Sequence, residues 1–279
     1  LIEAGRVTSY AALDDLSQRF ASGLADLGIG KGDRVALWLP NTPAHYALTF
    51  AVWRLGATVV GVNTRFRAKE VGDIVGRTGA KALAFWPGFK DIDFEAILAE
   101  VDPAVLSGLE TVIAHDVEGA PTVPAQVLGR PVHRLSAMAE AVPMAEDHGG
   151  PDVPAQIFTT SGTTSAPKFV LHAHRSLEEH AKRVARHWDL DAPDAVFLQT
   201  VDLDANRHRR LGRDALIDDE PRGRWPRRRE PPGVRDGADQ GNTECSRNLL
   251  VFGKASGACG EHLDAARNAR APTDVFLAL

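Results

Sequence analysis

The sequence predicts an α/β protein over residues 1–200, with mostly parallel sheets that are doubly wound, meaning flanked by helices on both faces. Two observations support this fold class. Short continuous apolar runs, typical of strands buried on both faces, alternate with segments whose apolar residues recur at helical spacing. Glycines close several of these segments, as expected at helix ends and turns. After residue 200 the sequence predicts a poorly ordered tail.

The first elements are a hairpin and a helix. Residues 2–8 predict a hairpin around Ala4-Gly5, and Ser9 is a favourable N-cap for the segment that follows. Gly28 and Gly30 then end a helix. Its apolar stripe consists of Leu13, Leu16, Phe20, Leu24 and Leu27.

The next segments predict two successive βαβ units, the repeating unit of a parallel sheet. Strands at 35–39, 58–62 and 81–86 alternate with helices at 43–55 and 69–77. Pro43 occupies the first helical position of its helix. We interpret Asp33, Arg34 and Asn41 as turn-forming and capping residues rather than catalytic ones.

The middle of the chain is less regular. We expect a helix at 96–101, a strand at 111–113, a surface excursion at 118–131, a linker at 145–154 and a strand at 195–198. The linker leads into a short strand at 155–158, a polar loop and a second strand at 169–171. A helix follows and runs to about Trp188.

The loop between those strands is the stretch richest in chemistry. It reads Thr-Thr-Ser-Gly-Thr-Thr-Ser-Ala-Pro-Lys from Thr159 to Lys168. Several backbone N–H groups, several hydroxyls and one ammonium in a small volume suit a polyphosphate. Gly162 allows close approach of the backbone, and Pro167 stiffens the exit toward Lys168. The simpler interpretation is a surface turn with an incidental lysine.

The order of these residues resembles the phosphate-binding signature of the adenylate-forming superfamily, which includes acyl-CoA synthetases, luciferases and the adenylation domains of peptide synthetases. All nine positions from Thr160 to Lys168 fit, although Ser165 stands where glycine is commonest. Phe169, just outside the signature, stands where glycine is usual. The loop is not a P-loop, which needs Gly-x-x-x-x-Gly-Lys-Ser/Thr before a helix. Residues 7–13, 28–41 and 56–63 also resemble segments of this superfamily, in the same order.

The resemblance implies an activity and a ligand set. Members activate a carboxylic acid with ATP to an acyl-adenylate and then pass the acyl group to a thiol, here coenzyme A. Mg²⁺ bridges the phosphates, and its usual protein ligand lies beyond the part of the family that this chain resembles. The residues expected to bind the ATP phosphates are Thr160, Ser161, Gly162, Thr163, Thr164, Ser165 and Lys168. Lys168 is also the expected catalytic residue, either by neutralising charge or by ordering the loop.

Composition excludes several other classes. The formal net charge of −5 gives no general electrostatic case for nucleic-acid binding. No apolar run is long enough to span a bilayer. The two cysteines are isolated in the sequence, which argues against a disulfide framework or a zinc site. A reducing, cytoplasmic location is therefore favoured. A metal site at His172 and His174 is a weaker interpretation than structural roles, because no carboxylate stands at a matching spacing.

Beyond about Thr200 the sequence changes character, with arginine-rich and proline-rich runs and little apolar periodicity until about Leu249. Residues 201–279 allow three interpretations: a basic nucleic-acid arm, a linker to another domain, or the product of a reading-frame shift near codon 200. We favour the third, because out-of-frame GC-rich codons translate into Arg, Pro, Gly, Ala and Asp.

We expect the chain to be an incomplete, N-terminal part of such an enzyme and inactive alone. The superfamily's later motifs, Tyr-Gly-x-Thr-Glu and Thr-Gly-Asp, do not occur in it. Because it opens on Leu1 rather than methionine, we also expect an upstream piece. The alternative function is a non-catalytic remnant that binds nucleotide weakly or does not fold stably.

Overall fold

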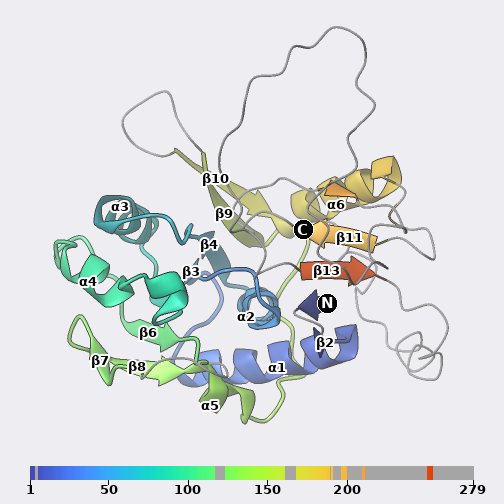
Figure 1. Cartoon of the computed structure of the whole chain (residues 1–279). Helices are drawn as coiled ribbons and strands as arrows, with labels where there is room; N and C mark the ends of the chain where they lie inside the picture. The colour runs from blue at the N-terminus through green and yellow to red at the C-terminus, as the bar shows by residue number, and fades with distance from the viewer. Residues whose placement is uncertain are drawn as a thin grey trace, which may run out of the picture.

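The computed structural model describes residues 1–3, 6–116, 123–160, 168–188, 190, 196–199, 209–210 and 250–253. Within them, the strands form one eight-stranded and one five-stranded sheet (Figure 1). The larger sheet has the strand order β10-β9-β4-β3-β5-β6-β8-β7. It carries the predicted βαβ units and therefore dominates the fold.

The interior of the larger sheet is parallel. Its parallel strands are β3 (Arg34–Trp38), β4 (Thr58–Gly61), β5 (Ala82–Phe85), β6 (Thr111–Ala114), β8 (Arg130–Arg134) and β9 (Pro154–Thr160). Antiparallel strands close its two edges: β10 (Lys168–Ala173) beside β9, and β7 (Gln126–Val127) beside β8. The predicted mostly parallel sheet is confirmed.

Helices cover both faces of this sheet, as predicted for a doubly wound fold (Figure 1). On one face, α1 (Tyr10–Asp26) and α2 (Pro43–Arg54) pack over a core that includes Leu37 and Val59. On the other face, α3 (Ala68–Thr78) and α4 (Phe94–Ala99) pack over Trp38 and Val60. The remaining helical segments are η1 (Phe89–Asp91), α5 (Leu135–Ala139) and α6 (His174–Trp188).

Several helix ends confirm the sequence predictions. The Ser9 hydroxyl accepts a hydrogen bond from the Ala12 N–H at the start of α1, and Pro43 occupies the first turn of α2. Gly79 ends α3 in the left-handed conformation with φ 60°, which a residue without a Cβ adopts at low cost.

Two predictions need correction. In the α1 stripe, Leu16 and Leu27 are only partly buried, because the packed face of the helix turns toward Ser17 and Ala21 instead. The predicted surface excursion at 118–131 is wrong over its second half, where β7 and the start of β8 join the sheet. Residues 117–122 lie outside the described residues.

Arg130 explains why this Pro-rich and Gly-rich stretch is part of the sheet. Its guanidinium donates to the carbonyl oxygens of Leu106, Leu109 and Leu128. The bonds to Leu106 and Leu109 tie β8 to the turn that leads into β6. Such a long-range anchor leaves no periodic signal in the sequence.

The five-stranded sheet is antiparallel. Its order is β12 (Arg209–Arg210), β11 (Val196–Gln199), β13 (Leu250–Gly253), β1 (Ile2–Glu3) and β2 (Arg6–Val7). The pairing of β1 with β2 confirms the predicted first hairpin, and β11 confirms the predicted strand near 195–198. Apart from β12 and β13, the predicted tail at 201–279 lies outside the described residues.

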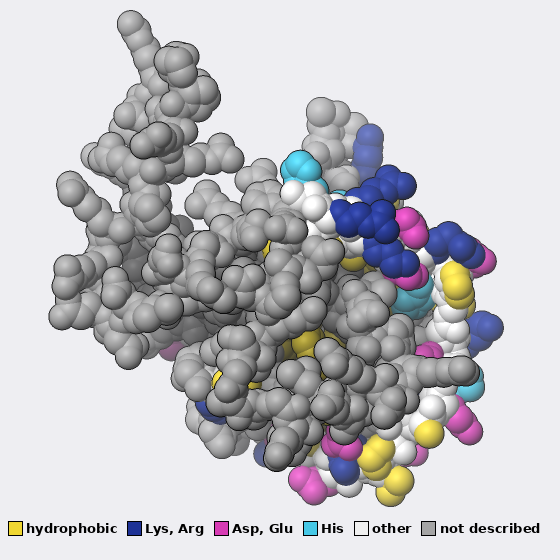
Figure 2. All heavy atoms as spheres, turned by 90° about the vertical axis from the view of Figure 1, so that its right-hand side faces the viewer, with side chains coloured by type: hydrophobic (Ala, Val, Ile, Leu, Met, Phe, Trp, Pro, Cys, Tyr) yellow, Lys and Arg dark blue, Asp and Glu magenta, His cyan; other side chains and the backbone are white. Residues whose placement is uncertain are grey.

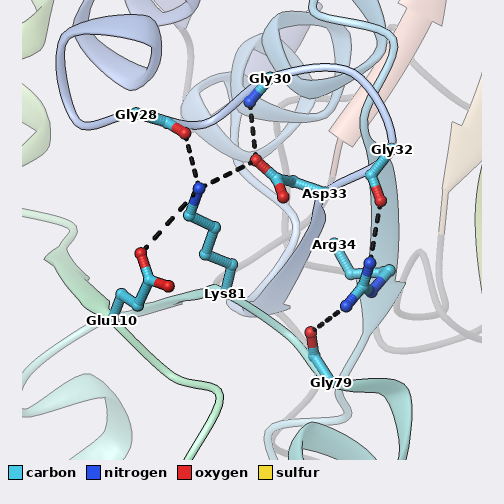
Figure 3. A network of polar contacts seen from close by, with 8 residues as sticks. All are labelled: Gly28, Gly30, Gly32, Asp33, Arg34, Gly79, Lys81 and Glu110. Carbon is cyan, nitrogen blue, oxygen red and sulfur yellow. Dashed lines mark hydrogen bonds and ion pairs between the residues drawn. The ribbon is translucent and has the colours of Figure 1, made fainter.

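A polar network joins the turns at the amino ends of the parallel strands (Figure 3). The Lys81 ammonium donates to the Gly28 carbonyl at 2.8 Å and lies 3.3 Å from Asp33 Oδ2 and 3.9 Å from Glu110 Oε2. Asp33 Oδ2 also accepts from the Gly30 N–H. Asp33 therefore has the structural role that the sequence predicts.

Arg34 completes the network from the first residue of β3 (Figure 3). Its guanidinium donates to the carbonyl oxygens of Gly32 at 2.9 Å, Thr78 at 2.9 Å and Gly79 at 2.6 Å. Arg34 thereby fixes the end of α3 against the start of β3. The turns at the amino ends of the strands are thus occupied by structural contacts. A binding site is therefore expected at the opposite edge, where the strands have their carboxyl ends.

Candidate functional site

The hydroxyl-rich loop joins β9 to β10 at the edge of the larger sheet. Thr160 is the last residue of β9, Lys168 is the first of β10, and the two are register partners. The Thr160 hydroxyl also donates to the Lys168 carbonyl at 3.5 Å. The two strands predicted on either side of the loop are therefore present. The other predicted phosphate-binding residues lie outside the described residues: Ser161, Gly162, Thr163, Thr164 and Ser165.

The direction of β9 decides at which edge this loop emerges. β9 runs parallel to β4, with Val60 opposite Ile157. Its carboxyl end therefore lies at the same edge as the carboxyl ends of β4, β3, β5 and β6. Ligands of open α/β sheets bind outside the carboxyl ends of the strands, near the strand where the winding reverses. Here the winding reverses at β3, which has β4 on one side and β5 on the other.

The two faces of the hairpin differ. Successive residues of a strand point to opposite faces, so Phe169 points one way and Lys168 the other. Phe169 packs with Ile157 against the core under α3. Lys168 is exposed, and among the described residues no carboxylate lies within ion-pair distance of its ammonium. A cation placed this way is available to an anionic ligand.

A second polar cluster at the carboxyl edge was missed by the sequence analysis. Thr42 follows β3 and caps α2 by accepting from the His45 N–H at 3.1 Å. Its hydroxyl lies 3.4 Å from Nε2 of His115, the residue that follows β6. Trp86, directly after β5, stacks on the His115 ring at 4.5 Å between centroids. The sequence held a signal for this cluster: Trp86 is the last residue of the predicted strand at 81–86, His115 lies two residues beyond the strand at 111–113, and Thr42 lies three residues beyond the strand at 35–39.

Both histidines of the cluster are buried and neutral near pH 7. Burial lowers the pKa of His45 to about 4, and burial with the nearby His45 lowers the pKa of His115 to about 4. His45 Nδ1 lies 3.1 Å from the Pro40 carbonyl, so it carries the proton and donates. Among the residues that the structure describes, His115 Nδ1 has no hydrogen-bond partner. The cluster therefore adds no positive charge for an anion to use.

The two histidines after the loop have contacts of their own. His172 Nδ1 lies 3.3 Å from the Ser176 hydroxyl. His174 begins α6, as predicted, and meets the Trp53 ring edge to face at 5.2 Å. Burial lowers the pKa of His174. The part of the chain that the structure describes holds no group of three side chains that could ligate a metal ion.

The side of the molecule that carries α6 mixes both signs of charge (Figure 2). Lys182 pairs with Glu178 at 2.6 Å, and Arg175 pairs with Asp152 at 3.1 Å. Charge alone therefore identifies no anion site on the described part of this side. Among all the residues that the structure describes, none of the helices has both the length and the apolar character that spanning a bilayer requires.

Fold and loop position together define a doubly wound α/β protein with a hydroxyl-rich hairpin at the carboxyl edge of its sheet. The sequence profile of the family described as AMP-binding enzyme matches residues 1–205. The chain belongs to this family, which confirms the resemblance seen in the sequence.

Known relatives are acyl-CoA ligases. The chain is 36% identical over 191 residues to the long-chain-fatty-acid–CoA ligase FadD13 of Mycobacterium tuberculosis, a match covering 68% of this chain and 34% of the ligase. It is 28% identical over 208 residues to the mitochondrial medium-chain acyl-CoA ligase ACSF2 of Rattus norvegicus, covering 69% and 33%. The chain thus spans about a third of the length of these relatives.

Solved structures agree. The N-terminal domain of FACL13 from Mycobacterium tuberculosis, crystallised with an inhibitor, superposes with a TM-score of 0.53 at 32% identity, over 64% of this chain and 40% of that one. A Mycobacterium tuberculosis fatty acyl CoA synthetase superposes with a TM-score of 0.52 at 31% identity, over 64% and 32%. The larger sheet and its helices are therefore the family's fold.

Proposed function

We propose that this chain supplies the ATP-phosphate-binding part of an adenylate-forming acyl-CoA ligase. The observation that carries the proposal is the β9–β10 hairpin, which brings Thr160 and Lys168 together at the carboxyl edge of the sheet with the lysine exposed. Membership of the AMP-binding family and the acyl-CoA ligase relatives support it. The substrates of the complete enzyme would be a carboxylic acid, ATP and coenzyme A.

Each loop residue has a proposed role. Thr160, Ser161, Thr163, Thr164 and Ser165 donate hydroxyl or amide hydrogens to the β- and γ-phosphate oxygens. Gly162 lets the backbone approach the phosphates. Lys168 neutralises the charge that develops as pyrophosphate leaves, so catalysis by this part is positioning and electrostatic stabilisation. Mg²⁺ between the phosphates would add charge neutralisation when bound.

The experiment is a titration of the purified chain with ATP, followed by calorimetry, for the parent and for Lys168→Ala. Losing a charge-assisted contact worth about 1.5–3 kcal/mol should weaken ATP binding roughly tenfold or more. Lys69→Ala is the matched control, since Lys69 is also an exposed lysine but lies in the first turn of α3. Equal affinities for Lys168→Ala and the parent would remove the assignment.

A second candidate is a chain that binds nucleotide without completing adenylation. The observation favouring it is that the family match ends at residue 205 and leaves 206–279 outside. The same boundary supports our proposal that 1–200 is the adenylation-domain part and 201–279 a frame-shifted or disordered tail. ATP–pyrophosphate exchange tests whether this chain completes adenylation: we expect none from it alone, and clear exchange would refute the second candidate and make the chain a working enzyme.

The tail has its own test, which is to resequence the DNA near codon 200 and translate the other two frames. A frame that restores an apolar strand and a Tyr-Gly-x-Thr-Glu segment would support the frame shift, and its absence in both frames would refute it.

We also propose a cytoplasmic location for the protein. Fractionation of the expressed protein would check it.

A further inference from the structure

One contact links the face of the β9–β10 hairpin that carries Phe169 to helix α3, about ninety residues earlier in the sequence. The Arg77 guanidinium carbon lies 4.4 Å from the centre of the Phe169 ring, within the range of a cation–π interaction. Arg77 is in the last turn of α3, and Phe169 immediately follows Lys168. A helix on one face of the sheet thereby contacts the strand that leaves the hydroxyl-rich loop.

Arg77 is held in place before it meets the ring. Its Nη1 donates to Asp73 Oδ2 at 2.9 Å, one helical turn earlier. Asp73 and Arg77 flank Ile74 and Val75, whose side chains are buried in the core under α3. The helix therefore presents the guanidinium in a fixed position, at a lower entropic cost than a freely rotating side chain would carry.

Phe169 is the anchor of the loop-proximal half of β10, where its neighbours in the strand are exposed. Within the described residues, β10 pairs only with β9 and forms the edge of the sheet. Its next residues, Val170 and Leu171, are 39% and 56% exposed. Edge strands with few buried contacts open readily. Phe169 alone in this strand packs against the core under α3, so it holds the loop-proximal end of β10.

Fixing Phe169 also fixes Lys168. The two residues are adjacent and point to opposite faces of the hairpin, so the position of the ring sets the direction in which the lysine leaves. The Thr160 hydroxyl, bound to the Lys168 carbonyl, restrains the same residue from the other strand. A glycine at position 169 would have no side chain for Arg77 to hold.

We propose that Arg77 and Phe169 form a clamp that positions Lys168 for an anionic phosphate ligand. Both are positioning residues, because neither side chain lies on the face from which Lys168 leaves the hairpin. The inference rests on the proposed function in one respect, namely that Lys168 is the group that meets the phosphates. The clamp itself rests on the contacts of Arg77 and Phe169.

The test is a double-mutant cycle on ATP affinity, using Arg77→Ala, Phe169→Leu and the pair together. A cation–π contact worth about 0.5–1 kcal/mol predicts that each single change weakens binding about two- to fivefold. The double variant should be no weaker than either single one, because both remove the same contact. Phe169→Tyr, which keeps an aromatic face, should restore parent affinity. Independent, additive losses would overturn the clamp.

Amide hydrogen exchange without nucleotide makes the clamp testable even if ATP binding fails. Exchange in a peptide covering residues 168–173 should speed up in Arg77→Ala and Phe169→Leu but not in Phe169→Tyr. A peptide covering 126–134, at the opposite edge of the sheet, is the internal control and should not change. Unaltered exchange at 168–173 in Arg77→Ala would refute the clamp.

The two proposals fail in different ways. A parent chain that binds no ATP, or a Lys168→Ala variant that binds it normally, contradicts the proposed function alone.

The unfolding midpoint distinguishes a clamp that positions Lys168 from a contact that only stabilises the fold. A clamp that positions Lys168 predicts a parent-like midpoint in Phe169→Leu with weakened ATP binding, whereas a purely structural contact predicts a lowered midpoint with parent-like binding.

Discussion

The centre of the large sheet and its β9–β10 edge are built in opposite ways. Every residue of β4, β5 and β6 is buried, while no residue of β10 is. The central strands therefore supply stability through apolar burial. The edge hairpin holds Thr160 and Lys168 where a ligand can reach them. The contrast places the burden of folding and the proposed binding role on different strands of one sheet.

The largest effect is expected from one substitution, valine to aspartate, made once in the central strand β4 and once in the edge strand β10. Val60→Asp puts a carboxylate into a fully buried site of β4 and should cost more than about 4 kcal/mol, enough to unfold the chain. Val170→Asp, on the 39% exposed side of β10, should change the free energy of unfolding by less than about 1 kcal/mol. Urea unfolding followed by circular dichroism measures both. Similar costs would break the comparison.

Acid should weaken the centre through its two buried histidines. In the folded chain the pKa values of His45 and His115 lie at about 4, below the ordinary value of 6.5, so the unfolded chain binds more protons as pH falls. The stabilisation is complete above about pH 6.5 and is lost below it, by about 2 kcal/mol between about pH 6.5 and about pH 5.5.

Urea unfolding across this pH range gives the slope, and His115→Phe provides the control. That variant keeps a ring against Trp86 but cannot titrate, so the slope should fall by about half. An unchanged slope would assign the acid sensitivity to other groups.

A smaller effect separates two helix caps. Thr42→Ala removes the cap of α2 and also the hydroxyl beside His115 Nε2, and should cost about 2 kcal/mol. Ser9→Ala removes only the exposed cap of α1 and should cost about 1 kcal/mol. Thermal midpoints of the two variants would show the order. A costlier Ser9→Ala would mean that burial at the carboxyl edge adds nothing to capping.

The smallest effect is expected at an exposed ion pair beside the hairpin. Arg175 and Asp152 are 62% and 84% exposed, and solvent screens their attraction. Arg175→Ala should leave the thermal midpoint unchanged within error. The pair Arg54–Asp14 is the comparison, since Arg54 is only 17% exposed and should be the costlier arginine to remove. A drop in Arg175→Ala equal to that in Arg54→Ala would contradict the difference between edge and centre.

Local chemistry in the sequence determined much of this protein. Continuous apolar runs identified the buried strands, Ser9 and Pro43 marked helix starts, and Gly79 marked a helix end. These signals are readable because each depends on a residue and its near neighbours. The order of residues 160–168 identified the family before any fold was known.

Only the tertiary structure decided which distant residues meet. The Arg130 guanidinium anchors β8 by donating hydrogen bonds to carbonyl oxygens some twenty residues earlier. The stacking of Trp86 on His115 and of Arg77 on Phe169 likewise joins segments from different elements. Such contacts depend on strand order and register, which arise when all the apolar faces are buried together. The sequence names the groups, and the packing of the sheet decides which of them act on one another.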